Sequence, residues 1–261
     1  MFETARFEAR QQLPGAVALA IGISVFAGMM IAIAPGILAE VDLEALTAQL
    51  PPQMVAAFSL SVIGTIEGFI ALELYEFVWL LGLGIYVAYQ GAGDIADDIE
   101  AGRMDMVLSA PVSRGQVVLE KFLALWTPML VVNAVVFAVV FAGTRLIDDP
   151  IAVTDLLAVH ALSIPYLLCC GALGVFASVA APRRVVAEGA AVGILVGTFL
   201  IEAVTIGTDA EWLASGAPMQ YYDPVAILTA SEYDLWGAGI LLAGTAVLLL
   251  ASRQWFERRD I

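Results

Sequence analysis

Long stretches without a charged residue constrain this chain more than any other feature. A helix needs about 20 mostly apolar residues to cross the hydrocarbon core of a bilayer. Stretches free of Asp, Glu, Lys and Arg include residues 11–39, 77–93, 122–144, 156–182, 189–201 and 235–252. With a few flanking residues added, they predict six membrane-spanning helices at about residues 14–38, 71–92, 115–142, 157–180, 186–206 and 234–252. The expected fold class is an all-α membrane protein with a single transmembrane domain over residues 1–261.

Composition agrees with this class, since 61% of the residues are hydrophobic, against about 45–50% in soluble domains. The cationic residues then predict the orientation. With six spans and both termini on one side, ten of the eleven Lys and Arg residues fall on that side, and only Arg145 falls on the other. Because cytoplasmic loops carry an excess of Lys and Arg, we expect both termini to be cytoplasmic, in a multi-pass protein of the plasma membrane.

The segments predicted outside are acidic, in a chain whose net charge is −15. Their carboxylates would either form an anionic vestibule for a cationic substrate or keep an acidic surface hydrated. One external segment, residues 208–231, is rather apolar but is broken by Gly216, Pro218 and Pro224. This pattern favours a re-entrant pair of short helices, which would have to pack against protein.

The segment 94–114, between the second and third spans, has the most informative pattern of charges. Residues 94–108 read as an amphipathic helix at the inner membrane surface, with Ile95, Ile99, Gly102 and Met106 on one side. A proline then ends this helix, and an S-x-x-Q capping box beginning at Ser113 starts the next one. A helix rooted at both ends in membrane spans could pass a push from a soluble partner into the membrane, or it could only orient the loop.

Two motifs in this chain resemble those of ABC type-2 permeases. The cytoplasmic loop of that family is similar to the string Glu100-x-Gly102, Leu108-Ser109-x-Pro111-Val112-Ser113-Arg114 and Lys121. The ending common in the family, F-x-R-R-D and a hydrophobic residue, is similar to Phe256-Glu257-Arg258-Arg259-Asp260-Ile261. The resemblance implies a six-helix permease subunit of an ATP-driven transporter, with the loop helix as a coupling helix. It would pair with a second permease copy or a related permease, and dock onto two copies of an ABC ATP-binding subunit.

The resemblance also implies which residues contact the ATP-binding subunit. They are Asp97, Asp98, Glu100, Gly102, Arg103, Pro111 and Arg114. Gly102 would permit close approach, and Arg103 or Arg114 could pair with acids on the partner. Arg103 stands where the family often has Thr, and Asp97-Asp98 where it often has a Glu pair, which could tune the match to a particular ATPase.

Groups for chemistry within the chain itself are scarce. The sequence has no G-x-x-x-x-G-K-[ST] phosphate-binding loop, so we expect no cofactor on this chain, and ATP and Mg would belong to the partner ATPase. It has one histidine, His160, and no pattern of metal ligands. No catalytic or metal site is therefore predicted, and the chain is not expected to be an enzyme. We also expect the chain to contact membrane lipids. Binding of nucleic acid is not expected.

Three carboxylates near the outer ends of spans leave a second hypothesis open. Glu73, Glu76 and Glu202 could line a translocation path or could extend their side chains toward water. The first hypothesis is the permease subunit of an ATP-driven transporter, and specifically an exporter. The alternative is a proton-coupled secondary transporter that uses these membrane-edge carboxylates, although their position away from mid-span argues against it. A membrane enzyme is the weakest of the three, because catalytic groups are lacking.

Overall fold

The computed structural model describes residues 3–40, 47–51, 62–109, 111–205 and 207–259. In these residues it contains six helical segments that are long and apolar enough to cross a membrane, which confirms the predicted fold class. Their elements are α1 (Glu3–Glu40), α4 (Ile66–Ile70) with η2 (Ala71–Leu83) and α5 (Gly84–Glu100), α7 (Arg114–Ala124) with α8 (Trp126–Leu146), α9 (Val153–Ala180), α10 (Arg184–Thr205) and α12 (Leu235–Arg258). The shorter elements are α6 (Met104–Ser109), η3 (Glu211–Gly216), η4 (Pro218–Tyr221) and α11 (Pro224–Ala230).

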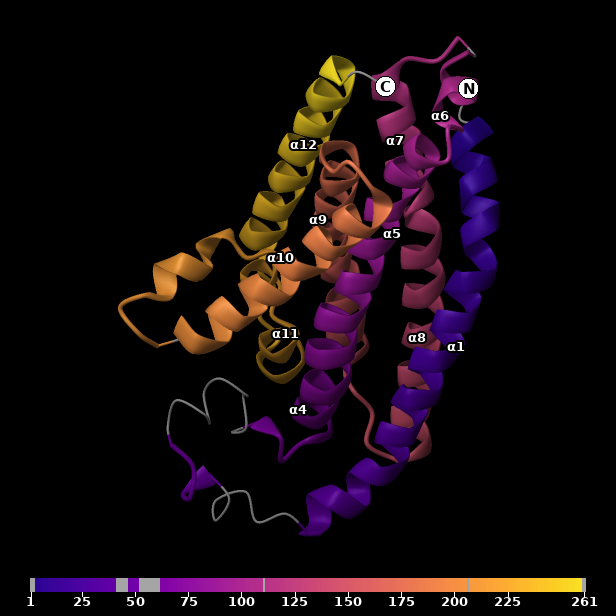
Figure 1. Cartoon of the computed structure of the whole chain (residues 1–261). Helices are drawn as coiled ribbons and strands as arrows, with labels where there is room; N and C mark the ends of the chain where they lie inside the picture. Colours follow the sequence, from indigo (N-terminus) through magenta and orange to yellow (C-terminus); the bar gives the residue numbers. More distant parts are fainter. Residues whose placement is uncertain (1–2, 41–46, 52–61, 110, 206, 260–261) are drawn as a thin grey trace.

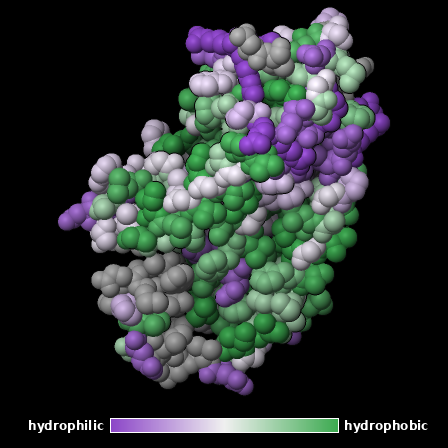
Figure 2. Space-filling model, in the orientation of Figure 1, coloured by the Kyte–Doolittle hydropathy of each residue, from purple (hydrophilic) through white to green (hydrophobic). Residues whose placement is uncertain are grey.

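Both ends of the chain lie at the same end of the bundle, together with α6 (Figure 1). Helices α5 and α9 form the centre, α1 and α8 pack together on one side, and α12 packs on α9 at the other. Hydrophilic residues gather at the end that holds the termini, and hydrophobic residues cover much of the face below it (Figure 2). This distribution suits a bundle whose middle is surrounded by lipid.

Small residues let the two central helices approach closely. A Cβ added to Gly174 of α9 would lie 2.1 Å from the carbonyl oxygen of Ala88 in α5. Toward the end that holds the termini, the hydroxyl of Ser178 accepts hydrogen bonds from the backbone N–H groups of Ile95 (3.1 Å) and Ala96 (2.8 Å). Because lipid provides little hydrophobic drive for helices to associate, close contacts of this kind hold membrane helices together.

The helix that holds the first span extends well beyond its apolar part. Helix α1 starts at Glu3 and continues through Pro14, whereas the apolar pattern placed the span at about 14–38. Its polar first turns pack on α7, where the carboxylate of Glu8 pairs with Lys121. Packing therefore extends the helix into residues that are too polar to be recognised as part of a span.

The second span contains an unusual helical segment. Its middle part, η2, is π-helical over 13 residues, and π-helical geometry rarely exceeds a single turn. The hydroxyl of Tyr166 in α9 donates a hydrogen bond of 2.7 Å to the carbonyl oxygen of Leu80 in this segment. The contact helps to hold η2 against α9.

The lone histidine lies in a buried polar cluster between spans. The hydroxyl of Tyr75 lies 2.9 Å from Nε2 of His160, and Oδ1 of Asn133 lies 3.0 Å from its Nδ1. The amide nitrogen of Asn133 donates to the carbonyl oxygen of Met129, so the amide oxygen of Asn133 faces the His160 ring. Because this oxygen can only accept, the ring proton is assigned to Nδ1 of His160. His160 is thus a hydrogen-bonded structural residue that joins η2, α8 and α9.

The external segment 208–231, expected as a re-entrant pair, forms three short helices, η3, η4 and α11. In Figure 1 they lie beside the part of the bundle opposite the termini rather than beyond it. Helix α11 packs against η2, α4 and α9, and the hydroxyl of Tyr222 donates a 2.9 Å hydrogen bond to the carbonyl oxygen of Val159. This packing against protein is the condition that a re-entrant segment must meet.

The close contact of the central helices predicts an effect of one methyl group. Gly174→Ala should force α5 and α9 apart and lower the unfolding free energy by about 1–3 kcal/mol, because the obstacle is backbone and cannot rotate away. Denaturant titration in detergent micelles would measure the loss. Gly193→Ala in α10, where an added Cβ meets nothing within 4 Å, is the matched control and should not destabilise. Equal stability of the two variants would contradict the proposed contact.

Candidate functional site

The helix expected over residues 94–108 is interrupted in the structure. Helix α5 ends at Glu100, and Gly102 adopts a left-handed φ of 67°. The N–H of Gly102 donates to the carbonyl of Ile99 (3.1 Å), and that of Arg103 to the carbonyl of Asp98 (2.8 Å), which is the Schellman pattern that ends many helices. The turn itself thus favours glycine at position 102, and the close approach of a partner that the resemblance implied stays a prediction.

The break changes which residues of the segment are buried. Met104, the first residue of α6, is 1% exposed, whereas Met106 is 68% exposed. The expected apolar face is therefore present in α5, where Ile95 is buried, but not in α6. An uninterrupted helical period cannot be carried through a left-handed residue, because the turn resets the direction of the side chains.

Arg103 folds back onto the end of α5. Its Nε lies 2.9 Å from Oδ1 of Asp98, and its Nη2 pairs with the carboxylate of Asp97. Hydrogen bonds to Asp97 and then Asp98 hold the pKa of the Arg103 guanidinium above its usual value. Arg103 therefore forms ion pairs within the chain, and the salt bridge with the partner that the resemblance implied stays a prediction.

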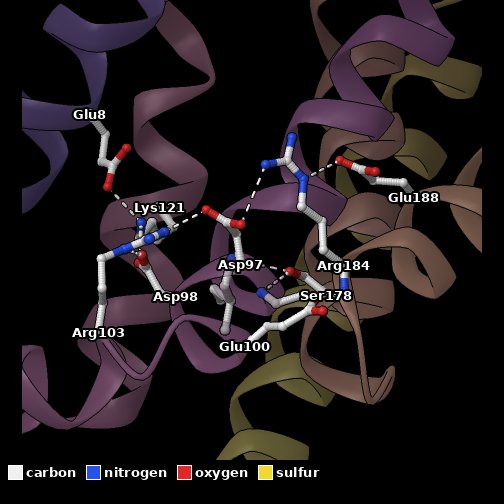
Figure 3. A network of polar contacts seen from close by, with 11 residues as sticks. Glu8, Asp97, Asp98, Glu100, Arg103, Lys121, Ser178, Arg184 and Glu188 are labelled. Carbon is white, nitrogen blue, oxygen red and sulfur yellow. Dashed lines mark hydrogen bonds and ion pairs between the residues drawn. The ribbon is translucent and has the colours of Figure 1, made fainter.

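Lys121 connects three helices at this end of the bundle (Figure 3). Its side chain is 3% exposed, and its Nζ lies 2.5 Å from Oε1 of Glu8 in α1 and 2.7 Å from Oδ2 of Asp98 in α5. Lys121 itself belongs to α7. The sequence motif contained this lysine, but no role was inferred for it, although a lysine in a long apolar helix is itself a signal of a buried partner.

Arg184 joins α10 to the same network (Figure 3). Its guanidinium lies 2.7 Å from Oε1 of Glu188 and 3.4 Å from Oδ1 of Asp97. The backbone N–H of Arg184, at the start of α10, donates a 3.0 Å hydrogen bond to Oε2 of Glu100. A carboxylate at a helix N-terminus is favourable both as a cap and toward the helix dipole, so Glu100 helps to fix the beginning of α10.

The two motifs that carry the family resemblance touch each other. Ser113 caps α7 by accepting from the N–H of Gln116, as expected. Nη1 of Arg114 donates to the carbonyl oxygens of Phe256 (2.9 Å) and Arg259 (2.5 Å), and its guanidinium lies 5.6 Å from the centre of the Phe256 ring. Arg114 thus holds the end of α12, and Pro111 lies exposed just before this joint.

A cavity of about 680 Å³ opens beside the charged network. Its lining includes three of the predicted residues, Asp97, Asp98 and Arg103, as well as Glu8 and Lys121. Glu100, Gly102, Pro111 and Arg114 lie outside this lining. Thus the structure brings part of the predicted set together around a cavity and places the rest at the helix joints around it.

A family model described as ABC-2 family transporter protein matches residues 8–261. The chain belongs to this family. It is therefore a membrane permease component of an ABC transporter, a multi-pass protein of a cell membrane that associates with an ABC ATP-binding subunit. No sequence among the curated proteins matches the chain.

The carboxylates that were candidates for a translocation path lie toward the opposite end of this ABC-2 permease. Glu76 of η2 is within electrostatic range of Glu202 of α10 and of Asp223, the cap of α11. Glu73 lies three residues before Glu76 on the same helix. Asp223 was not singled out from the sequence, because only the folding of the external segment brings it near the spans.

The buried ammonium group of the permease predicts a large effect of its removal. Lys121→Met should lower the unfolding free energy by about 3–5 kcal/mol, because Glu8 and Asp98 would lose the cation that compensates their charge. Denaturant titration in detergent micelles would measure it. Adding Glu8→Gln and Asp98→Asn to the same chain should recover part of the loss.

The matched control for this prediction is Arg253→Met. Arg253 pairs with Glu257 on the exposed surface of α12, where a salt bridge contributes little. A similar loss of stability in the Lys121 and Arg253 variants would show that the buried network does not have the proposed role.

Proposed function

We propose that this chain is the permease subunit of an ATP-driven exporter. It would work as a dimer, with a second copy or a related permease, and with two copies of an ABC ATP-binding subunit that hold ATP and Mg. Its termini and α6 would face the cytoplasm, because ten of the eleven Lys and Arg residues fall on that side. Energy from the partner would enter the membrane through this end.

The single observation that supports this proposal best is the ion-paired network at the end that holds the termini. It joins α1, α5, α7 and α10 through Lys121, Asp98, Asp97 and Arg184. Since a buried or partly buried ion pair loses most of its stabilisation when its partners separate, these helix ends tend to move together. A push on the segment between α5 and α7 would thus reach four spans at once.

We infer that the exposed side of α6, with the adjoining Glu100, contacts the ATP-binding subunit. Arg103 and Arg114 bind groups of the chain itself. On α6, by contrast, Asp105 and Met106 are exposed. Methionine is enriched at protein interfaces, whose rim is polar and solvent-accessible. In this proposal Asp97, Asp98, Gly102, Arg103, Pro111 and Arg114 shape and support the coupling surface more than they touch the partner.

We further propose that Glu76 and Glu202, with Glu73 nearby, border the translocation path toward the external side. The support is that Glu76 and Glu202 come from different spans and lie close enough to each other and to Asp223 to interact electrostatically. Carboxylates that converge near a membrane are costly unless they serve a function or reach water. Such a border favours a substrate with cationic character.

The proposed coupling surface predicts that Met106→Asp weakens binding of the ATP-binding subunit about ten-fold or more, because a carboxylate would be buried at the interface. The affinity-tagged permease would be purified from its native membrane, its ABC ATPase identified by mass spectrometry and then co-expressed, and the retained ATPase quantified. Leu146→Asp, an equally drastic change at the opposite end of the bundle, where Leu146 is 83% exposed, is the control and should retain the ATPase.

The opposite pattern, with ATPase lost from the Leu146 variant and kept by the Met106 variant, would place the interface elsewhere. Substrate transport by the permease alone in vesicles, driven by a proton gradient without any ATPase, would instead favour the secondary-transporter alternative.

A further inference from the structure

The end of α12 carries two adjacent arginines, Arg258 and Arg259, that form no ion pair with the carboxylates of the described residues. In the described residues, Arg103, Lys121, Arg184 and Arg253 form ion pairs with carboxylates. Arg114 and Arg259 donate instead to neutral backbone carbonyls. Within the same part of the chain, no carboxylate lies within ion-pair distance of Arg258 or Arg259. The end of α12 thus carries guanidinium charge that the described residues leave uncompensated.

A cavity of about 500 Å³ lies beside these arginines, between α9 and α12. It is lined by Phe176, Ala251, Gln254, Trp255, Arg258 and Arg259. The rings of Phe176 and Trp255 meet edge to face, with centroids 6.4 Å apart, and Trp255 is 53% exposed. The cavity therefore has an apolar wall and two cations, and its volume is within the range of about 300–1,000 Å³ usual for small-ligand sites.

The position of the cavity indicates what kind of anion it would meet. The uncharged run of α12 ends at Ser252, so Trp255 falls about one turn, and Arg258 nearly two turns, beyond the apolar part of the span. Tryptophan favours this interfacial level of a bilayer, and basic pockets between membrane helices bind anionic lipid head groups. A small soluble anion would leave the rings of Phe176 and Trp255 without an apolar contact from the ligand, whereas a lipid would cover them.

We propose that this cavity binds an anionic phospholipid from the leaflet on the side of the termini. The phosphate contacts the guanidinium groups of Arg258 and Arg259, and the glycerol and first acyl carbons lie along Phe176 and Trp255. Arg259 keeps donors for the phosphate, because a guanidinium has five N–H groups and, among the described residues, only its Nη1 is bonded, to the carbonyl oxygen of Val179 at 2.7 Å. The bound lipid would neutralise the positive charge of Arg258 and Arg259 at the end of α12, which Arg114 also contacts.

The experiment is native mass spectrometry of the full-length permease in detergent, titrated with phosphatidylglycerol or with phosphatidylcholine of the same acyl chains. The wild-type protein should retain phosphatidylglycerol preferentially. Arg258→Gln should reduce its retention about five-fold, the contribution of one arginine near a membrane surface. Arg258→Lys should restore most of it. Arg253→Gln, with the same change of charge on the same helix but at a residue paired with Glu257, should bind like the wild type.

Three outcomes would overturn the proposal. Equal retention of the two lipids would show that the site does not recognise an anionic head group. Equal losses of phosphatidylglycerol retention in the Arg258→Gln and Arg253→Gln variants would show that retention depends on the general surface charge and not on this cavity. Displacement of phosphatidylglycerol by millimolar inorganic phosphate alone would identify a free-anion site rather than a lipid site. Because Arg258 is exposed and takes part in no hydrogen bond or ion pair among the described residues, its variants should fold normally.

Discussion

The buried ammonium group of Lys121 is the constraint on which the arrangement of this end of the molecule depends. Removing a cation from water costs several kcal/mol, and the cost is offset only where carboxylates lie at good geometry. Glu8 and Asp98 meet that condition from α1 and α5. Because one ammonium group must pair with carboxylates on two other helices, it fixes the axial positions of the three helices relative to one another. Apolar packing against lipid would not fix these positions.

Around this constraint, the charged residues of the segment 94–114 divide into two kinds. Most of them, including Asp97 and Arg103, are committed to contacts within the chain. A few, on and beside α6, remain exposed at the surface. A segment that is rigid on its inner side and open on its outer side is suited to receive a force and to transmit it. This division gives the ABC-2 family motif a physical reason: it encodes the helix joints that support the proposed contact surface.

Much of the fold could be predicted from the sequence, because the cost of placing charge in lipid leaves a strong pattern of uncharged stretches. The cap at Ser113 was equally local, and it is confirmed. The break at Gly102 also had a local signal, since glycine after a helical run commonly ends a helix, but the amphipathic pattern masked it. By contrast, the contacts of Lys121 with Glu8 and of Arg114 with the end of α12 join residues more than 100 positions apart. No local pattern contains that information, and for the same reason Asp223 was missed beside Glu76.

The bond between Arg114 and the carbonyl oxygens of Phe256 and Arg259 has a practical consequence for handling the protein. The carboxyl end of the chain is held against the first turn of α7, beside the segment proposed to meet the ATPase. A fluorescent protein or purification tag joined to this end of the chain would lie close to the proposed docking face. The amino-terminal end offers little more room, because α1 packs on α7 as well. A reporter inserted at the other end of the bundle would lie away from that face.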